Sequence, residues 1–292
     1  MPLNSEIVGM SLDPVEMLVT PRIALAYSAV LGETTTSSFD DASPDFAATP
    51  LFCVRPEWQF VISSRRDRFG LTPAESLRAV HAGQSTTFHA LLQPGKRIRV
   101  SGSVVSVRQT RAGALSTTKI DTIDLTDGTL LSSTLSEGIY RDVSVEGGDR
   151  ASEEYRPAAR REFDARDAAE VIVPLDRWFA HRYSECASIW NPIHTEQKVA
   201  RAAGLPGSIV HGTALWALAG KAVADAYLGG NTRELQALSG RFSAMVRAGT
   251  PITIRFRRSQ SRPDEVAFEV LNERGEAAVS SGTAVLLQHS TP

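Results

Sequence analysis

The spacing of apolar residues changes from helical to alternating twice along the 292-residue chain, and this repeated change constrains the fold more than any other feature. In each half, apolar residues at helical spacing come first, and segments with a period of two follow, joined by short turns. Helices followed by an antiparallel sheet make an α+β plan. The repetition predicts an internal duplication of a unit with about half the length of the chain.

In the first half, Pro21 stands where a helix can begin and Gly32 stands where it can stop. Leu51–Ser64 is mostly apolar but contains Arg55-Pro56-Glu57, and the sequence does not separate helix from strand there. The strands expected after it are Ser85–Leu92, Lys96–Arg108, Thr117–Leu125 and Thr129–Tyr140.

The second half follows the same plan. A short strand is expected over Ala168–Val173, a helix within Leu175–Ser188, and a longer helix over Thr213–Tyr227. The strands expected after them are Leu235–Val246, Ile252–Arg258, Glu265–Leu271 and Ala277–Gln288. Leu92–Val100 parallels Val246–Ile254, and Val80–Gly83 loosely parallels Val210–Gly212, which supports the duplication.

Between the halves, Arg141–Asp167 is charged and poor in branched apolar residues. Such a segment is typical of a solvated linker. We therefore expect a first domain over residues 1–141, a linker over 142–167 and a second domain over 168–292.

The composition excludes several classes of protein. A net charge of −2 gives no basic face for nucleic acid, and two cysteines are too few for a disulfide framework. No apolar run approaches the length of a membrane span, and the first residues lack the order of a signal peptide, so a cytoplasmic protein is expected. Neither a HExxH nor a CxxC spacing occurs, which argues against a zinc site.

One stretch of the second half, Tyr183–Leu218, holds the residues most suited to chemistry. His194 follows the turn Asn191-Pro192-Ile193, and His211 precedes Gly212 at the start of a helix rich in small residues. A histidine in a turn and a glycine amide at a helix start can together polarise a carbonyl group.

This stretch resembles the MaoC-like, hydratase-2 family of hotdog-fold enzymes. The family's pattern is an aromatic residue, small residues, Gly-Asp-x-Asn-Pro-(Ile/Leu)-His and, further on, His-Gly. Here Asn191-Pro192-Ile193-His194 and Val210-His211-Gly212 match it in order, and Arg241–Ala244 with Gly249 resembles the strand and turn that follow. The resemblance covers residues 168–287 most strongly, and residues 20–141 look like the degenerate first half of double-hotdog members. It implies a double hotdog fold, in which two helix-wrapped antiparallel sheets make a pseudo-dimer within one chain.

The resemblance also implies a reaction, the reversible syn addition of water to a trans-2-enoyl thioester to give a (3R)-3-hydroxyacyl thioester. Family members use an Asp and the motif His to hold and deprotonate water, and a glycine amide at the start of the central helix binds the thioester oxygen. This chain departs from the pattern, because Ile189 stands where the family has the Asp and no acid lies between Ser188 and His194.

Three residues are the candidates for catalysis. His194 is the expected general base, since an imidazole with a pKa near neutrality can take a proton from water and return one to the α-carbon. Gly212 is the expected oxyanion donor, because amides at a helix start favour developing negative charge. Asn191 orients water or, as we favour, holds the turn through its side chain.

Other residues are assigned to the surroundings of the site. The expected substrate-binding set is Trp190, Ile189, His211 and Ser188, with His211 structural and buried beside the helix start. The candidates to replace the missing acid are Ser184, Glu185, Ser188 and Glu196. Residues with weaker signals are His81 and His89, expected to be remnants or packing residues, and Arg255, Arg257 and Arg258, which either pair with coenzyme A phosphates or are simply solvated.

We therefore expect a lyase of fatty acid metabolism that hydrates an enoyl thioester or dehydrates a 3-hydroxyacyl thioester. Coenzyme A is expected only as part of the substrate, with a carrier protein as the other possible carrier, and no cofactor or metal is expected. Monomer and homodimer both stay open. The alternatives are a lyase or cyclase with altered chemistry on the same scaffold and a non-catalytic acyl-CoA-binding subunit, with a thioesterase as a lesser option.

Overall fold

The computed structural model describes residues 1–65, 69–76, 78–159 and 162–287. Within these ranges, eleven strands form one sheet in the order β2-β4-β5-β6-β3-β10-β13-β12-β11-β9, with β8 beside β4. All neighbours in this sheet are antiparallel. Its strands are β2 (Ser11–Leu18), β3 (Ala79–Phe88), β4 (Arg97–Thr110), β5 (Gly113–Asp124), β6 (Leu130–Arg141), β8 (Arg150–Ala151), β9 (Ala169–Val173), β10 (Leu235–Phe242), β11 (Ile252–Arg258), β12 (Glu265–Leu271) and β13 (Ala277–Leu286). A separate parallel pair joins β1 (Leu3–Asn4) to β7 (Val145–Glu146).

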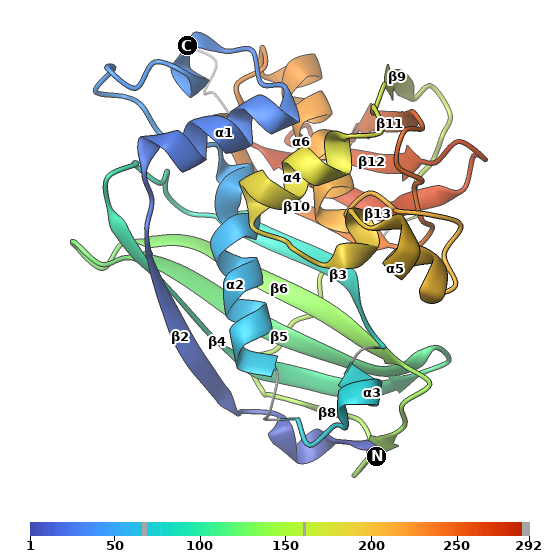
Figure 1. Ribbon diagram of the computed structural model, residues 1–292. Coiled ribbons are helices and arrows are strands. Elements are labelled where there is room, and N and C mark those ends of the chain that lie inside the picture. The colour runs from blue at the N-terminus through green and yellow to red at the C-terminus, as the bar shows by residue number, and fades with distance from the viewer. Residues whose placement is uncertain (66–68, 77, 160–161, 288–292) are drawn as a thin grey trace.

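The helices of the described residues lie outside the sheet layer, with α2, α4 and α5 on the side that faces the viewer (Figure 1). The α-helices are α1 (Pro21–Leu31), α2 (Val54–Arg65), α3 (Pro73–Ser76), α4 (Phe179–Ala187), α5 (Gln197–Ala202) and α6 (Gly212–Tyr227). The 3-10 helices are η1 (Ser5–Ile7), η2 (Thr36–Ser38), η3 (Pro50–Cys53), η4 (Pro192–His194) and η5 (Thr232–Glu234). The α+β plan is therefore confirmed.

The two halves of the sheet repeat one topology about a central pair of strands. The order β2-β4-β5-β6-β3 on one side matches β9-β11-β12-β13-β10 on the other, element by element. β3 and β10 pair antiparallel at the centre, with Ser85 opposite Ser239. In chain order α2 precedes β3 as α6 precedes β10, so these two helices occupy equivalent places. This repetition is what an internal duplication produces.

The long helix α6 packs against the C-terminal half of the sheet because small residues let it approach closely. A Cβ atom at Gly220 would lie 2.7 Å from Leu238 Cδ2, so a larger residue at this position would force the helix away from β10. Trp216 on α6 and Phe268 on β12 are fully buried in the core between them. Burial of this apolar face fixes the start of α6, where the candidate site lies.

Several expected elements are confirmed, with shifted ends. The strand expected over Ser85–Leu92 begins earlier, at Ala79, and the strand expected over Leu235–Val246 ends earlier, at Phe242. The expected end of the last strand at Gln288 lies outside the described residues. The apolar stretch that the sequence left open is helical, as α2.

One proposed parallel between the halves is wrong. His81 lies within β3, whereas His211 immediately precedes α6, so the two histidines occupy different places in the duplicated unit. The parallel between Leu92–Val100 and Val246–Ile254 is confirmed, since β4 and β11 begin in these two segments and hold equivalent positions in the sheet.

The charged segment between the halves runs along the sheet where the structure describes it. β8 pairs with β4, and the amide of Ser152 donates to the carbonyl of Val105. Arg257 on β11 pairs with Asp164 across 2.9 Å. The division into domains at residues 141 and 168 stays a prediction. None of the described helices is both long and apolar enough to cross a membrane.

Candidate active site

The turn that carries His194 is built by the end of α4 and by one side-chain cap. Ser188 adopts a left-handed conformation, with φ at 54°, and ends α4, while the amide of Ile189 donates to the carbonyl of Ser184. The side chain of Asn191 then accepts from the amide of Ile193 and opens η4. The chain thereby reverses and presents His194 to the start of α6.

Two histidines meet in this turn. The rings of His194 and His211 stack with their centroids 3.7 Å apart and an interplanar angle of 24°. His194 Nδ1 lies 2.9 Å from the carbonyl oxygen of Ile209, and His211 Nε2 lies 3.1 Å from the hydroxyl of Ser184. A carbonyl only accepts, so His194 Nδ1 must carry the hydrogen and Nε2 is the ring's acceptor. No described residue hydrogen-bonds Nε2 of His194.

Burial keeps both rings neutral. It lowers the pKa of His194 to about 4, against the partly opposing hydrogen bond to the Ile209 carbonyl. Burial first, and the neighbouring His194 second, hold the pKa of His211 well below its usual range. The assumption of a pKa near neutrality for His194 is thus corrected, because the ring is desolvated. Two neutral rings can stack closely without charge repulsion.

Gly212 begins α6 directly beside this pair, with His211 as the residue that precedes the helix. Because Gly212 is the first residue of the helix, its backbone N–H has no hydrogen-bond acceptor within the helix. A Cβ atom at Gly212 would lie 3.0 Å from Cγ of Phe242, so the glycine allows the Phe242 ring to pack against the helix start. The amide, the ring of His194 and the ring of Phe242 therefore gather at one end of α6.

A buried set of hydroxyl groups supports the helix start from the other side. The hydroxyl of Tyr183 donates to Thr213 across 3.3 Å and lies 3.1 Å from the hydroxyl of Tyr27. The ring of Tyr183 also lies 5.0 Å from that of His211. These contacts hold α1, α4 and α6 together behind the histidine pair.

No carboxylate among the described residues hydrogen-bonds either histidine. Ile189, where the family has its acid, is only 2% exposed and packs in the main core. Of the candidate replacements, only the hydroxyl of Ser184 contacts the pair, at His211. Ser188 is buried with no described partner for its hydroxyl, and Glu185 is exposed. Glu196 is also exposed and precedes α5.

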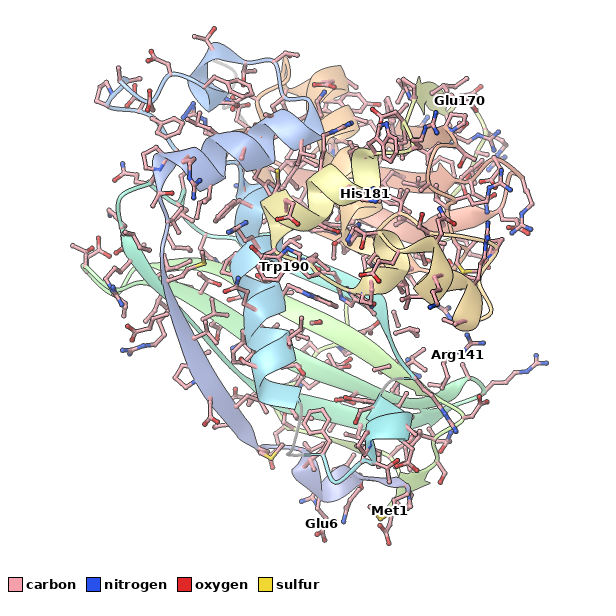
Figure 2. All side chains as sticks on the ribbon, in the orientation of Figure 1. Met1, Glu6, Arg141, Glu170, His181 and Trp190 are labelled. Atoms are coloured by element: carbon pink, nitrogen blue, oxygen red, sulfur yellow. The ribbon has the colours of Figure 1, made fainter. Side chains whose placement is uncertain are left out.

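The remaining predicted residues lie further out. Trp190 is 63% exposed and lies between α4 and α2 in projection (Figure 2), and Asn191 is also exposed. Arg255 pairs with Glu170, and Arg258 donates to the carbonyl of Pro263, so both are engaged on the C-terminal strands. His89 is exposed and lies 3.2 Å from Ser133.

Three aromatic side chains near the helix start were not assigned to the site from the sequence. The ring of His81 lies 4.9 Å from Phe242 and 6.2 Å from Trp58 on α2. These residues come from three separate elements, and two of them lie in the other half of the chain. Of these three residues, only Phe242 could be placed from the sequence, because the alternation of side chains along a strand puts Phe242 and Leu238 on one face of β10. Across the described ranges, His, Cys, Asp and Glu side chains form no group of three suited to a metal ion.

Solved structures share this architecture over almost the whole chain. A MaoC-like dehydratase from Phytophthora capsici has a TM-score of 0.83 at 20% identity, covering 97% of this chain and 98% of that one. A conserved hypothetical protein from Mycobacterium tuberculosis, described as having a double hotdog fold, has a TM-score of 0.61 at 13% identity and covers 95% and 96% of the two chains. The fold is therefore the double hotdog fold, as predicted.

Sequence comparison defines the second half further. Residues 173–276 match the family model described as MaoC like domain. The matched part of the chain holds both histidines and Gly212.

Curated relatives match at modest identity. The 3-hydroxyacyl-thioester dehydratase Y of Mycobacterium tuberculosis is 26% identical over 208 residues, which cover 70% of this chain and 67% of that protein. Fatty acid synthase subunit beta of Aspergillus oryzae is 32% identical over 126 residues, which cover 40% of this chain but only 6% of that protein. The chain thus spans a small part of the latter relative's length.

Proposed function

We propose that the protein catalyses the reversible hydration of a trans-2-enoyl thioester, with His194 as the general base and the Gly212 amide as the oxyanion donor. The observation that carries this proposal is the convergence of the His194 ring and the start of α6 on one point, where His194 stacks on the residue that precedes Gly212. A neutral imidazole with an accepting Nε2 and an unpaired helix amide are the two groups that addition to an enoyl thioester requires.

The proposed reaction moves one proton through His194. Nε2 of His194 takes a proton from water, and the water oxygen bonds to C3 of the enoyl group. The electron pair of the double bond moves toward the thioester carbonyl, and the N–H of Gly212 hydrogen-bonds the oxygen that becomes negative. The imidazolium then returns the proton to C2, which gives a 3-hydroxyacyl thioester. Addition of both groups from the side of His194 is syn, which is the geometry of addition that the family resemblance implies.

His211 acts in this proposal by positioning His194. It lies against His194 over the whole ring, is 2% exposed, and is itself held by the hydroxyl of Ser184. The carbonyl of Ile209 fixes the other edge of His194. Together they hold the base in one orientation and one tautomer, which lowers the cost of reaching the reactive geometry.

The names of relatives support this proposal at the level of reaction class. One is a 3-hydroxyacyl-thioester dehydratase, and another is an enoyl-CoA hydratase, ChsH3 of Mycobacterium tuberculosis, 29% identical over 117 residues. Hydration and dehydration are two directions of one reaction. We therefore propose an acyl thioester as substrate, with coenzyme A or a carrier protein as its thiol, no further cofactor, and either a monomer or a homodimer as the working form.

The test is the loss of absorbance as purified protein hydrates crotonyl-CoA and longer trans-2-enoyl-CoAs. His194→Ala is expected to lower kcat/KM by about 1000-fold, since general base catalysis commonly contributes 10²–10⁴-fold. His89→Ala, which removes an exposed histidine from the first half, is the matched control and is expected to keep wild-type activity. Wild-type turnover by His194→Ala would remove this residue from the mechanism.

A second candidate is a protein that binds an acyl thioester without converting it. The observation in its favour is that neither histidine has a carboxylate partner within the described ranges, so the two-residue base of the family is incomplete. Thermal-shift titration with acyl-CoAs beside the hydration assay separates the two functions. Saturable binding with no turnover of any enoyl-CoA would favour this second candidate.

A further inference from the structure

The face of the N-terminal half-sheet that lies under α2 is lined with hydroxyl groups. α2 crosses β4, β5 and β6 on this face (Figure 1). The residues that we call the hydroxyl face are Thr86, Ser116, Thr122, Ser132, Thr134 and Ser136. All six are almost fully buried. Strand register places them on one face, because Thr122 pairs with Ser132 and Thr86 pairs with Thr134.

The fold itself does not require this polarity. The equivalent face of the duplicated unit, under α6, presents Leu238, Phe268 and Ala284 and is part of the main apolar core. Beneath α2 the sheet therefore buries these hydroxyl groups beside an apolar cluster that includes Val100 and Ile120, whereas the face beneath α6 belongs to the main apolar core. Buried hydroxyl groups destabilise a protein unless they are hydrogen-bonded. Their concentration in one half of the chain therefore indicates that this face binds a polar group or serves a function.

A carboxyl group from α2 is embedded in this face. Thr134 donates to Oε1 of Glu57 across 2.8 Å, and the hydroxyl of Thr86 lies 2.8 Å from that of Thr134. Burial raises the pKa of Glu57 to about 8, against the opposing hydrogen bonds from Thr134 and Ser132. Glu57 is therefore protonated near neutral pH and can donate a hydrogen bond as well as accept one.

Several polar atoms of this region are buried without a partner among the described residues. They include the hydroxyls of Ser116 and Thr122 and the indole Nε1 of Trp58 on α2. Ser116 and Thr122 are 1% and 3% exposed, so bulk solvent does not satisfy them. Unpaired donors of this kind mark a place where a water or a ligand atom completes the hydrogen bonding.

The hydroxyl face connects to the candidate active site through two aromatic rings. Phe242 packs on Gly212, and the ring of His81 lies 4.9 Å from Phe242. Nε2 of His81 lies 3.4 Å from the hydroxyl of Ser136, the first member of the hydroxyl face on this side. From Ser136 to Ser132 the face extends along β6 for about 13 Å, at about 3.3 Å per residue.

We propose that the hydroxyl face binds the distal part of the acyl chain and selects acyl thioesters whose chain carries a hydroxyl or keto oxygen. This inference rests on the proposed function of the His194 site. A thioester held at Gly212 extends its acyl group past Phe242 and His81 toward Thr134 and Glu57. On this face an oxygen on the chain meets both donors and acceptors, among them the hydroxyls of Ser116 and Thr122, which a saturated alkyl chain leaves unpaired.

The test compares trans-2-decenoyl-CoA with its 10-hydroxy and 9-keto derivatives as substrates. Wild type is expected to show a kcat/KM about tenfold higher for the oxygenated chains, because a site built to hydrogen-bond rejects an analogue without the polar group. Thr134→Val is expected to reduce this preference to about twofold or less, and Thr134→Ser to retain it. Thr87→Val is the matched control, since Thr87 neighbours Thr86 on β3 but is exposed on the opposite face. A wild-type preference for the plain chain, or an unchanged preference in Thr134→Val, overturns the inference.

A binding measurement separates failure of this inference from failure of the proposed reaction. Saturated decanoyl-CoA and 10-hydroxydecanoyl-CoA cannot be hydrated, so calorimetry with either reports binding alone. Tighter binding of the hydroxylated ligand without turnover of any enoyl-CoA would sink the hydratase proposal and keep the chain selectivity. Equal or tighter binding of decanoyl-CoA overturns the selectivity whatever the turnover. The same titration on Thr134→Val, checked for a native circular dichroism spectrum, assigns the effect to the hydroxyl face.

Discussion

Lowering the pH should destabilise the protein in part through His194. Its pKa is about 4 in the folded chain against 6.5 for the free side chain, because burial disfavours the charged ring. The unfolded chain therefore binds the proton first as pH falls below 6.5, and the stability that the neutral ring contributes above that pH is lost progressively down to about pH 4. Integrated for this one group, the loss relative to pH 7 is about 2 kcal/mol at pH 5 and about 3 kcal/mol at pH 4.

The assay is urea unfolding of wild type and His194→Gln at pH 7, 6, 5 and 4. Glutamine cannot take up the proton, so the variant should lack this part of the pH dependence, while carboxylates and His211 contribute to both curves. The difference in free energy of unfolding between the two proteins should narrow by about 3 kcal/mol from pH 7 to pH 4. Parallel curves for the two proteins would refute a partly buried, neutral His194 with a lowered pKa. For a hydratase, kcat/KM of wild type should also stay level from pH 8 through pH 6. An inflection of the wild-type profile near pH 6.5 that disappears in His194→Gln would contradict the low pKa of His194.

Two substitutions test the packing of the site. Gly212→Ala places a methyl group 3.0 Å from the Phe242 ring, so the amide should be displaced and kcat/KM of the hydration reaction should fall by about 10–100-fold. The double variant Gly212→Ala with Phe242→Ala should recover part of this loss. An unchanged kcat/KM in the single variant would show that the amide tolerates movement. Ile189→Asp buries a carboxylate in the core and should cost about 3–5 kcal/mol in urea unfolding, against less than about 0.5 kcal/mol for Trp190→Asp on the surface. A stable Ile189→Asp variant with increased hydration would instead show that position 189 can serve as the family's acid.

The fold was largely predictable because its strands alternate and its turns contain glycine. The edge strand β2 was missed, since Pro14 interrupts the pattern of Ser11–Leu18. The register of β2 against β4 shifts between Leu12 and Val15, at the proline, which is where an edge strand can accommodate a residue without an amide hydrogen. An alternating pattern therefore identifies central strands better than edge strands.

The helix α2 could not be assigned because its apolar residues do not follow a single face. Glu57 and Phe60 of this helix are both buried, one among the hydroxyl groups and the other in an apolar cluster. A helix with both polar and apolar buried positions shows neither the helical nor the alternating period clearly. The polarity of its partner sheet, which explains the pattern, is a tertiary property.

The sequence motif brought His194, His211 and Gly212 together, and the structure describes how they lie. The stacking of the two rings and their low pKa depend on the depth at which α6 is buried, which local sequence does not encode. The contribution of His81 and Trp58 was also out of reach, since they approach Phe242 only through the pairing of β3 with β10.

A crystal structure with a bound, unreactive acyl-CoA would show directly whether the start of α6 and His194 hold the substrate. We expect the thioester oxygen within hydrogen-bond distance of the Gly212 amide, with C3 of the acyl group facing Nε2 of His194. A thioester bound elsewhere, with the start of α6 unoccupied, would contradict it.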